Sequence, residues 1–127
     1  MPSEIEKKFF DYWLENACGE EQFLSDACEK ESFDSQARER YRIEPFIERY
    51  AEFGSVNGLD VLEVGIGLGA DHFRFAGGNP RTLIGVDYTH RAVALSSKRF
   101  RLAGRCCCCF VADAESLPFS EESFDYF

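Results

Sequence analysis

Three glycines stand at alternate positions in the run EVGIGLGA: Gly65, Gly67 and Gly69. They follow a short apolar run at residues 61–64, which predicts a strand, and they precede a segment that predicts a helix. Glycines at this spacing allow a tight turn and let a ligand approach the backbone closely. The free N–H groups at the start of the following helix add to this binding capacity. The run therefore predicts a ligand-binding loop.

Glu63 lies two residues before the first of these glycines. A carboxylate at this place repels a pyrophosphate and favours a ligand that carries an ammonium or sulfonium group. Gly65, Gly67 and Ala70 also satisfy the pattern G-x-G-x-x-A, so the glycines alone leave a dinucleotide cofactor open. A further alternative is that Glu63 only forms hydrogen bonds within the loop region.

Two more acidic residues end apolar runs: Asp87 ends LIGVD, and Asp113 ends CCCCFVAD. Asp87 can accept hydrogen bonds from both ribose hydroxyls of an adenosine ligand. The ring of Tyr88 can stack on adenine, and Asp113 can accept a bond from an exocyclic amino group. Because ligands of open parallel sheets bind at the carboxyl ends of the strands, these features together predict one site.

The elements that position these residues alternate between strand and helix. Apolar runs at residues 61–64, 81–87 and 106–113 predict strands, and SFDYF at residues 123–127 predicts the start of a fourth. Residues 89–105 predict a helix with Thr89 as its N-cap and Gly104 at its end. This alternation predicts an α/β fold with a parallel sheet and right-handed crossovers, covered on both faces.

Residues 1–57 predict a helical segment that precedes an α/β core at residues 58–127. Helices are expected over residues 3–16 and 32–53, with a new helix or a kink at Pro45 and a stop at Gly54. Apolar side chains at helical spacing predict a buried face. The residues of this stripe are Tyr41, Ile43, Phe46, Ile47 and Tyr50.

The net charge of −9 argues against a surface built for nucleic acid or for an anionic membrane. No stretch approaches the ~20 apolar residues of a membrane span, and the N-terminus lacks an apolar signal core. These features predict a cytoplasmic protein whose six cysteines are mostly reduced.

The remaining residues that could do chemistry carry weaker predictions. The four consecutive cysteines at positions 106–109 predict an apolar third strand, with oxidation as their main liability. Cys18 and Cys28 are expected to be isolated thiols, and no spacing predicts a metal site. His72 is expected on a helix surface.

The segments VLEVGIGLGADH, GVDYT and VADAESLPFSEESFDYF resemble motif I, the acidic motif of the second strand and the later motifs of class I S-adenosylmethionine-dependent methyltransferases. The closest resemblance is to the small-molecule enzymes grouped with ubiquinone and menaquinone biosynthesis, and it covers about residues 59–127. It implies a Rossmann-like fold, S-adenosylmethionine as cofactor, and transfer of the sulfonium methyl to O, N or C of a small-molecule acceptor.

The resemblance also implies roles for single residues. Glu63 and the glycine loop at residues 65–69 border the methionine part of the cofactor. Asp87 binds the ribose hydroxyls, and Tyr88 flanks the adenine. Asp113 and the backbone of Ala114 bind the adenine edge. The sequence specifies neither a catalytic base nor an oligomeric state.

One departure from the family pattern concerns length. The family sheet has seven strands, whereas this chain ends as the fourth begins, so we expect the cofactor-binding half of a methyltransferase, truncated and inactive alone. An NAD-dependent dehydrogenase domain is the alternative, but it leaves Glu63 and the run ADAESLPF unexplained. A non-catalytic cofactor-binding fragment is a third interpretation.

Overall fold

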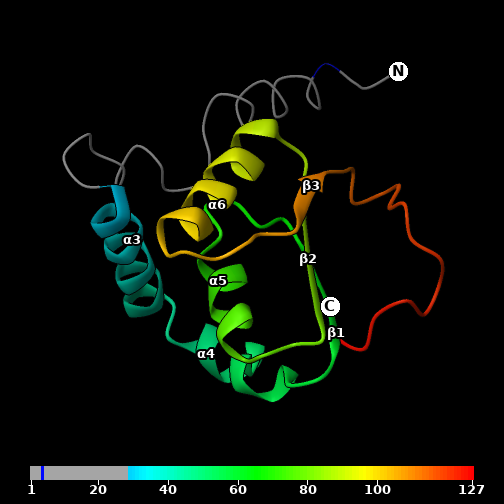
Figure 1. Cartoon of the computed structure of the whole chain (residues 1–127), viewed down its shortest axis with the longest axis horizontal. Coiled ribbons are helices and arrows are strands. Elements are labelled where there is room, and N and C mark those ends of the chain that lie inside the picture. Colours follow the sequence, from blue (N-terminus) through cyan, green and yellow to red (C-terminus); the bar gives the residue numbers. More distant parts are fainter. Residues whose placement is uncertain (1–3, 5–28) are drawn as a thin grey trace.

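The computed structural model describes Glu4 and residues 29–127 (Figure 1). Cys18, Cys28 and, apart from Glu4, the helix expected over residues 3–16 lie outside the described residues. The predicted division into a segment at residues 1–57 and a core at residues 58–127 stays a prediction.

Three parallel strands form the sheet in the order β1-β2-β3: Asp60–Val64, Thr82–Asp87 and Cys109–Val111. On the other side of β1, Val61 forms a single parallel bridge with Tyr126. The amide of Leu62 donates to the Tyr126 carbonyl at 3.0 Å. The fourth apolar run therefore begins to pair next to β1, where the sequence predicted a strand. The Rossmann-like α/β fold is confirmed.

Two helices make the crossovers: α5, Ala70–Gly77, and α6, His90–Leu102. The hydroxyl of Thr89 accepts from the amide of Ala92 at 3.2 Å, which confirms the predicted cap. The predicted parallel sheet with flanking helices is confirmed. In the described residues, α3, α5 and α6 cover one face of the sheet, while the segment after β3 lies on the other (Figure 1). None of the described helices is long and apolar enough to cross a membrane.

The third strand is shorter than predicted. Only Cys109 of the four cysteines belongs to β3, and Cys106 and Cys108 are exposed. The ladder with β2 begins near Cys108, whose carbonyl accepts from Gly85 at 2.9 Å. Because strand pairing starts there, the first cysteines lie in irregular chain after α6.

Two helices and a short turn precede the sheet: α3, Glu29–Ile43, α4, Phe46–Ala51, and the 3₁₀ turn η1, Phe53–Val56. Pro45 immediately precedes α4, so the predicted break at this proline is confirmed. The predicted stop at Gly54 is wrong, because α4 ends at Ala51 and the left-handed Glu52 turns the chain (φ 49°).

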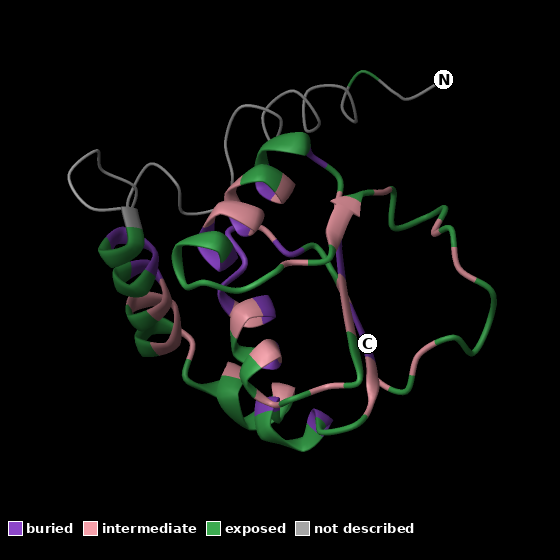
Figure 2. Ribbon diagram, in the orientation of Figure 1, coloured by how far each residue is buried: buried purple, intermediate pink, exposed green. Residues whose placement is uncertain are grey.

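The core lies between the helices and the sheet, where Figure 2 shows the buried residues gathered. Phe53, Val56, Val61 and Phe75 form one buried cluster, against which Tyr41 and Ile47 pack. The remaining members of the predicted apolar stripe do not join it. Their exposed fractions are 59% for Ile43, 54% for Phe46 and 77% for Tyr50. The predicted stripe is thus only partly buried.

Candidate functional site

The glycine loop between β1 and α5 is anchored on the neighbouring elements. The amide of Gly65 donates to the Val86 carbonyl at 2.8 Å, and the amide of Gly67 donates to Oδ2 of Asp87 at 3.0 Å. The hydroxyl of Ser96 in α6 donates to the Gly67 carbonyl at 2.8 Å. These bonds hold the loop against the carboxyl end of β2, where ligands of such sheets bind.

Gly65, Gly67 and Gly69 all have positive φ angles, of 79°, 53° and 78°. A Cβ atom on Gly65 or Gly67 meets nothing within 4 Å, so these two border open space. A Cβ atom added to Gly69 would lie 2.8 Å from Oγ of Ser96. The first two glycines therefore leave the backbone accessible, whereas Gly69 lets the loop pack closely on α6.

Asp87 ends β2 and connects the loop to the next helix. Its Oδ1 accepts from the amide of Thr89 at 3.1 Å, while Oδ2 holds Gly67. Each carboxylate oxygen has further lone pairs, so Asp87 can also accept from ligand hydroxyls. Tyr88 follows directly and is 48% exposed.

Asp113 and Ala114 lie beyond the same end of the sheet. Val111 pairs with Asp87, and the amide of Ala112 donates to the Asp87 carbonyl at 2.9 Å. Asp113 and Ala114 are exposed, and Oδ1 of Asp113 accepts from the amide of Glu115 at 2.9 Å. The strand pairing thus carries Asp113 to the end of the sheet that holds Asp87.

A cavity of about 330 Å³ opens beside the glycine loop, between β1, α5 and α3. Glu63, Gly65 and Gly67 line it, and Asp71 and Arg40 form part of the wall. Tyr88, Asp113 and Ala114 are not among its lining residues. The predicted site residues therefore fall into two groups, one around the cavity and one along the ends of β2 and β3.

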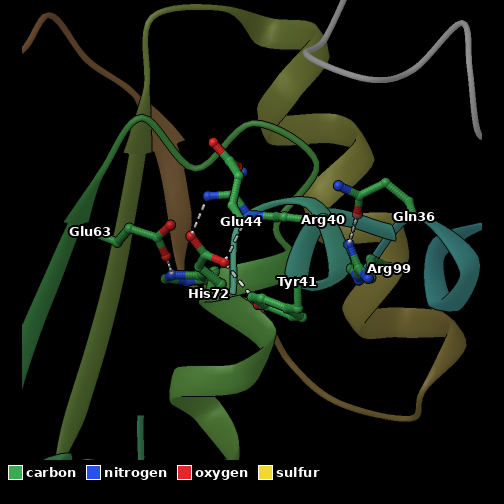
Figure 3. A network of polar contacts seen from close by, with 8 residues as sticks. Gln36, Arg40, Tyr41, Glu44, Glu63, His72 and Arg99 are labelled. Atoms are coloured by element: carbon green, nitrogen blue, oxygen red, sulfur yellow. Dashed lines mark hydrogen bonds and ion pairs between the residues drawn. The ribbon is translucent and has the colours of Figure 1, made fainter. Parts of the chain in front are cut away.

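Arg40 of α3 is bound to Asp71 of α5 at the cavity wall (Figure 3). Its Nε and Nη2 donate to the two Asp71 oxygens at 3.0 and 2.7 Å. The hydroxyl of Tyr41 also donates to Asp71 at 2.8 Å, and burial together with this carboxylate raises the pKa of Tyr41. These contacts fix α3 over the loop.

Glu63, which is partly buried, and His72 form a pair on the same side (Figure 3). Oε2 of Glu63 lies 3.0 Å from Nδ1 of His72, whose side chain is fully buried. Burial raises the pKa of Glu63, and the bond from His72 opposes that rise. The expectation of a surface histidine is wrong. A Cβ atom on Gly85 would lie 2.8 Å from the imidazole, so this glycine makes room for it.

The cavity wall is predominantly acidic. Among the described lining residues, four carry carboxylates and Arg40 is the one basic side chain. The acidic residues are Glu39, Glu44, Glu63 and Asp71. Arg40 pairs with Asp71, and Arg42 pairs with Glu39. The remaining negative charge of the wall therefore lies mainly at Glu63 and Glu44 and favours a ligand with positive charge.

Sequence reasoning missed Arg40, Asp71 and the buried position of His72. Asp71 follows Gly69 by two residues, so its closeness to the loop was a usable signal. Arg40 lies 31 positions from Asp71, and no local pattern in the sequence connects the two. Among the described residues, no group of three or more His, Cys, Asp or Glu side chains is arranged to hold a metal ion.

Residues 61–127 match the sequence profile of a family described as "Methyltransferase domain". A comparison with curated proteins found no match. Among solved structures, the YcgJ protein of Bacillus subtilis is 27% identical with a TM-score of 0.57, and the alignment covers 65% of this chain and 36% of that one. The PH0226 protein of Pyrococcus horikoshii OT3 is 20% identical with a TM-score of 0.62, covering 91% and 48%.

A third similar structure is the magnesium protoporphyrin IX methyltransferase of Synechocystis PCC 6803 with bound S-adenosylmethionine. It is 15% identical with a TM-score of 0.63, covering 91% of this chain and 58% of that one. This chain therefore spans from about a third to three-fifths of the length of these structures. The cofactor predicted from the sequence is confirmed as that of the family. The chain belongs to the methyltransferase domain family, with the Rossmann-like fold of class I S-adenosylmethionine-dependent methyltransferases.

Proposed function

We propose that this protein transfers a methyl group from S-adenosylmethionine to a small-molecule acceptor. The observation that carries the proposal is the acidic wall of the cavity beside Gly65 and Gly67. S-adenosylmethionine carries an ammonium and a sulfonium group, both of which are attracted by such a wall. The chain's share of its solved relatives' length makes the acceptor and the complete activity part of this proposal.

Glu63 is the residue that we assign to the cationic methionine end of the cofactor. His72 donates to one oxygen of its carboxylate and so restricts the orientation of the side chain. Open space at Gly65 and Gly67 gives the amino-acid part access to the backbone. His72 is therefore a positioning residue, which acts through Glu63.

The adenosine end is assigned to the tips of β2 and β3. We place the ribose hydroxyls on Asp87 and one face of the adenine on Tyr88. Asp113 and the backbone of Ala114 then meet the edge of the adenine. The strand register, which pairs Asp87 with Val111, supports this grouping.

The chemistry supplied by the bound cofactor is a methyl carbon made electrophilic by its sulfonium. Transfer of this methyl to a nucleophilic atom of the acceptor would break the carbon–sulfur bond and leave S-adenosylhomocysteine as the product. The residues of this chain hold and orient the donor, which lowers the entropic part of the barrier. The anchored loop and the clamp between Arg40 and Asp71 supply that rigidity.

The NAD-dependent alternative is less consistent with the same geometry. A pyrophosphate bound at the glycine loop would lie near Glu63 and near Asp71 in the first turn of α5. The Glu63 carboxylate repels a pyrophosphate and cancels part of the attraction from the helix N-terminus, whereas Arg40 largely offsets the charge of Asp71. The acidic wall therefore favours the sulfonium cofactor.

Calorimetric titration with three ligands tests the proposal. We expect saturable binding of S-adenosylhomocysteine and no measurable binding of NAD. Glu63→Gln is expected to weaken S-adenosylhomocysteine roughly tenfold or more, as for loss of a hydrogen bond to a charged group. Methylthioadenosine lacks the amino-acid part and should bind the variant and the parent equally. Tighter binding of NAD than of S-adenosylhomocysteine would overturn the proposal.

A further inference from the structure

Two of the four consecutive cysteines have their sulfur atoms in contact. Sγ of Cys107 donates to Sγ of Cys109 at 3.3 Å. The hydroxyl of Ser97 in α6 lies 3.3 Å from the same Cys109 sulfur. Cys107 and Cys109 are partly buried, whereas Cys106 and Cys108 are exposed. The run thus contains two pairs with equal spacing but different surroundings.

The contact between the sulfurs activates one of them. The hydrogen bond from Cys107 lowers the pKa of the Cys109 thiol to about 6, burial opposes this, and the bond to Ser97 lowers it further. The same contact raises the pKa of Cys107. The contact therefore favours the thiolate of Cys109, the nucleophilic form of cysteine, beside a protonated partner thiol.

A second cavity, of about 330 Å³, opens beside Cys107, whose sulfur contacts that of Cys109. Cys107 and its two neighbours line it together with Phe100 and His72. Nε2 of His72 is buried without a hydrogen-bond partner among the described residues.

We propose that Cys107 and Cys109 form a reversible disulfide when the protein meets hydrogen peroxide. The Cys109 thiolate attacks one peroxide oxygen, the O–O bond breaks, and the released hydroxide takes up a proton to become water. The sulfur is thereby oxidised to a sulfenic acid. The thiol of Cys107 attacks this sulfur, the S–O bond breaks, and a second water leaves. Two thiols and one peroxide thus give one disulfide and two water molecules.

The spacing of the two residues permits this ring and also makes it labile. In extended chain, residues two apart have Cα atoms about 6.6 Å apart, near the upper end of the range for disulfides. The small ring closed by residues two apart leaves the bond little freedom to reach the preferred disulfide geometry, so it is expected to be easily reduced. Cys106 and Cys108 share the spacing, so the contact between sulfurs, not the spacing, selects the reactive pair.

Peptide mapping of the oxidised full chain tests the proposal. The protein is treated with equimolar hydrogen peroxide, its free thiols are alkylated, and trypsin is added. Cleavage after Arg105 leaves all four consecutive cysteines on residues 106–127, away from Cys18 and Cys28. We expect this peptide to lose two hydrogens and to carry alkyl groups on Cys106 and Cys108 only. Treatment with dithiothreitol should restore alkylation at all four.

Matched variants identify the pair. The double variant Cys106→Ser with Cys108→Ser should still form the disulfide, whereas Cys107→Ser with Cys109→Ser should not. In the single variant Cys107→Ser, we expect dimedone to trap a sulfenic acid at Cys109, because the resolving thiol is gone. Cys109→Ser should give no such adduct at Cys107.

Two results would overturn the proposal. One is a disulfide that joins Cys106 to Cys108, or that forms equally well in the Cys107→Ser, Cys109→Ser variant. The other is full alkylation of all four cysteines after peroxide treatment. Far-UV circular dichroism of each variant shows whether the fold is retained, and the dimedone result with Cys107→Ser needs only one substitution.

Discussion

The carboxylate of Glu63 in β1 lies 3.0 Å from Nδ1 of His72 in α5, and the imidazole is fully buried while Glu63 is partly buried. An ionised carboxylate can only accept a hydrogen bond, so Nδ1 of His72 must be the donor and carry the proton. In the neutral imidazole, Nε2 then carries no proton. The bond joins the strand before the glycine loop to the helix after it. The bond therefore connects Glu63, the acidic residue assigned to the cofactor, to the buried side chain of His72 in the core.

Removing the donor of His72 should weaken cofactor binding. His72→Phe keeps a ring in the core but leaves the partly buried Glu63 carboxylate without its partner. We expect a loss of about 1–3 kcal/mol in the free energy of binding. His72→Asn keeps an N–H near the position of Nδ1 and should retain more of the affinity. Calorimetry with S-adenosylhomocysteine measures both variants. If His72→Phe binds S-adenosylhomocysteine as tightly as the parent does, while His72→Asn binds it more weakly, then His72 does not act through Glu63.

Binding of S-adenosylhomocysteine should weaken as the pH falls. The ammonium of the ligand is attracted by ionised Glu63, and burial raises the pKa of this residue above 4.5. As the pH falls, Glu63 is therefore protonated at a higher pH than an ordinary glutamate. Its attraction for the ligand's ammonium group is lost at that point. Titrations between pH 8 and pH 5 in Glu63→Gln are expected to show a smaller pH dependence. An unchanged pH profile in that variant would assign the dependence to another group.

Two glycine substitutions should separate binding from stability. Gly67→Ala places a methyl in open space and should reduce ligand affinity, with the strain of a positive φ as its main effect on stability. Gly69→Ala meets Oγ of Ser96 at 2.8 Å and should lower the midpoint of thermal unfolding more. Thermal melts and calorimetry on both variants check this. Equal losses of stability would contradict the distinction.

The buried guanidinium of Arg99 should be important for stability. It donates to the side chain of Gln36 at 2.9 Å and to the carbonyls of Leu68 and Phe33 at 3.1 and 2.6 Å. Arg99→Met leaves these acceptors buried without donors, so we expect a loss of about 2–4 kcal/mol in the free energy of unfolding. Urea denaturation measures the loss. The exposed Arg101→Met, in the same helix, is the matched control and should change little.

Much of the fold could be predicted because the signals are local. The apolar runs predicted the bounds of β1 and β2 to within one residue. Thr89 precedes the first residue of α6, and Gly104 follows shortly after its last. The third strand is shorter because pairing with β2, and not apolar character, decides its start.

The site was less accessible to sequence reasoning because long-range contacts build part of it. Arg40 reaches Asp71 only after α3 has folded onto α5, and no periodicity in the sequence specifies that docking. His72 can be buried because Gly85, in β2, has no side chain that would collide with the imidazole. A glycine inside an apolar strand was the available signal, since it often marks a close approach of another group.

The most direct test of the proposed function is a ¹H–¹⁵N correlation spectrum recorded during titration with S-adenosylhomocysteine. We predict that the largest shifts map to the amides of Gly65, Gly67, Asp87, Tyr88, Asp113 and Ala114, and that NAD at the same concentration leaves these signals in place. Shifts confined to other parts of the protein, or larger shifts at these amides with NAD, would contradict a cofactor site for S-adenosylmethionine at this edge of the sheet.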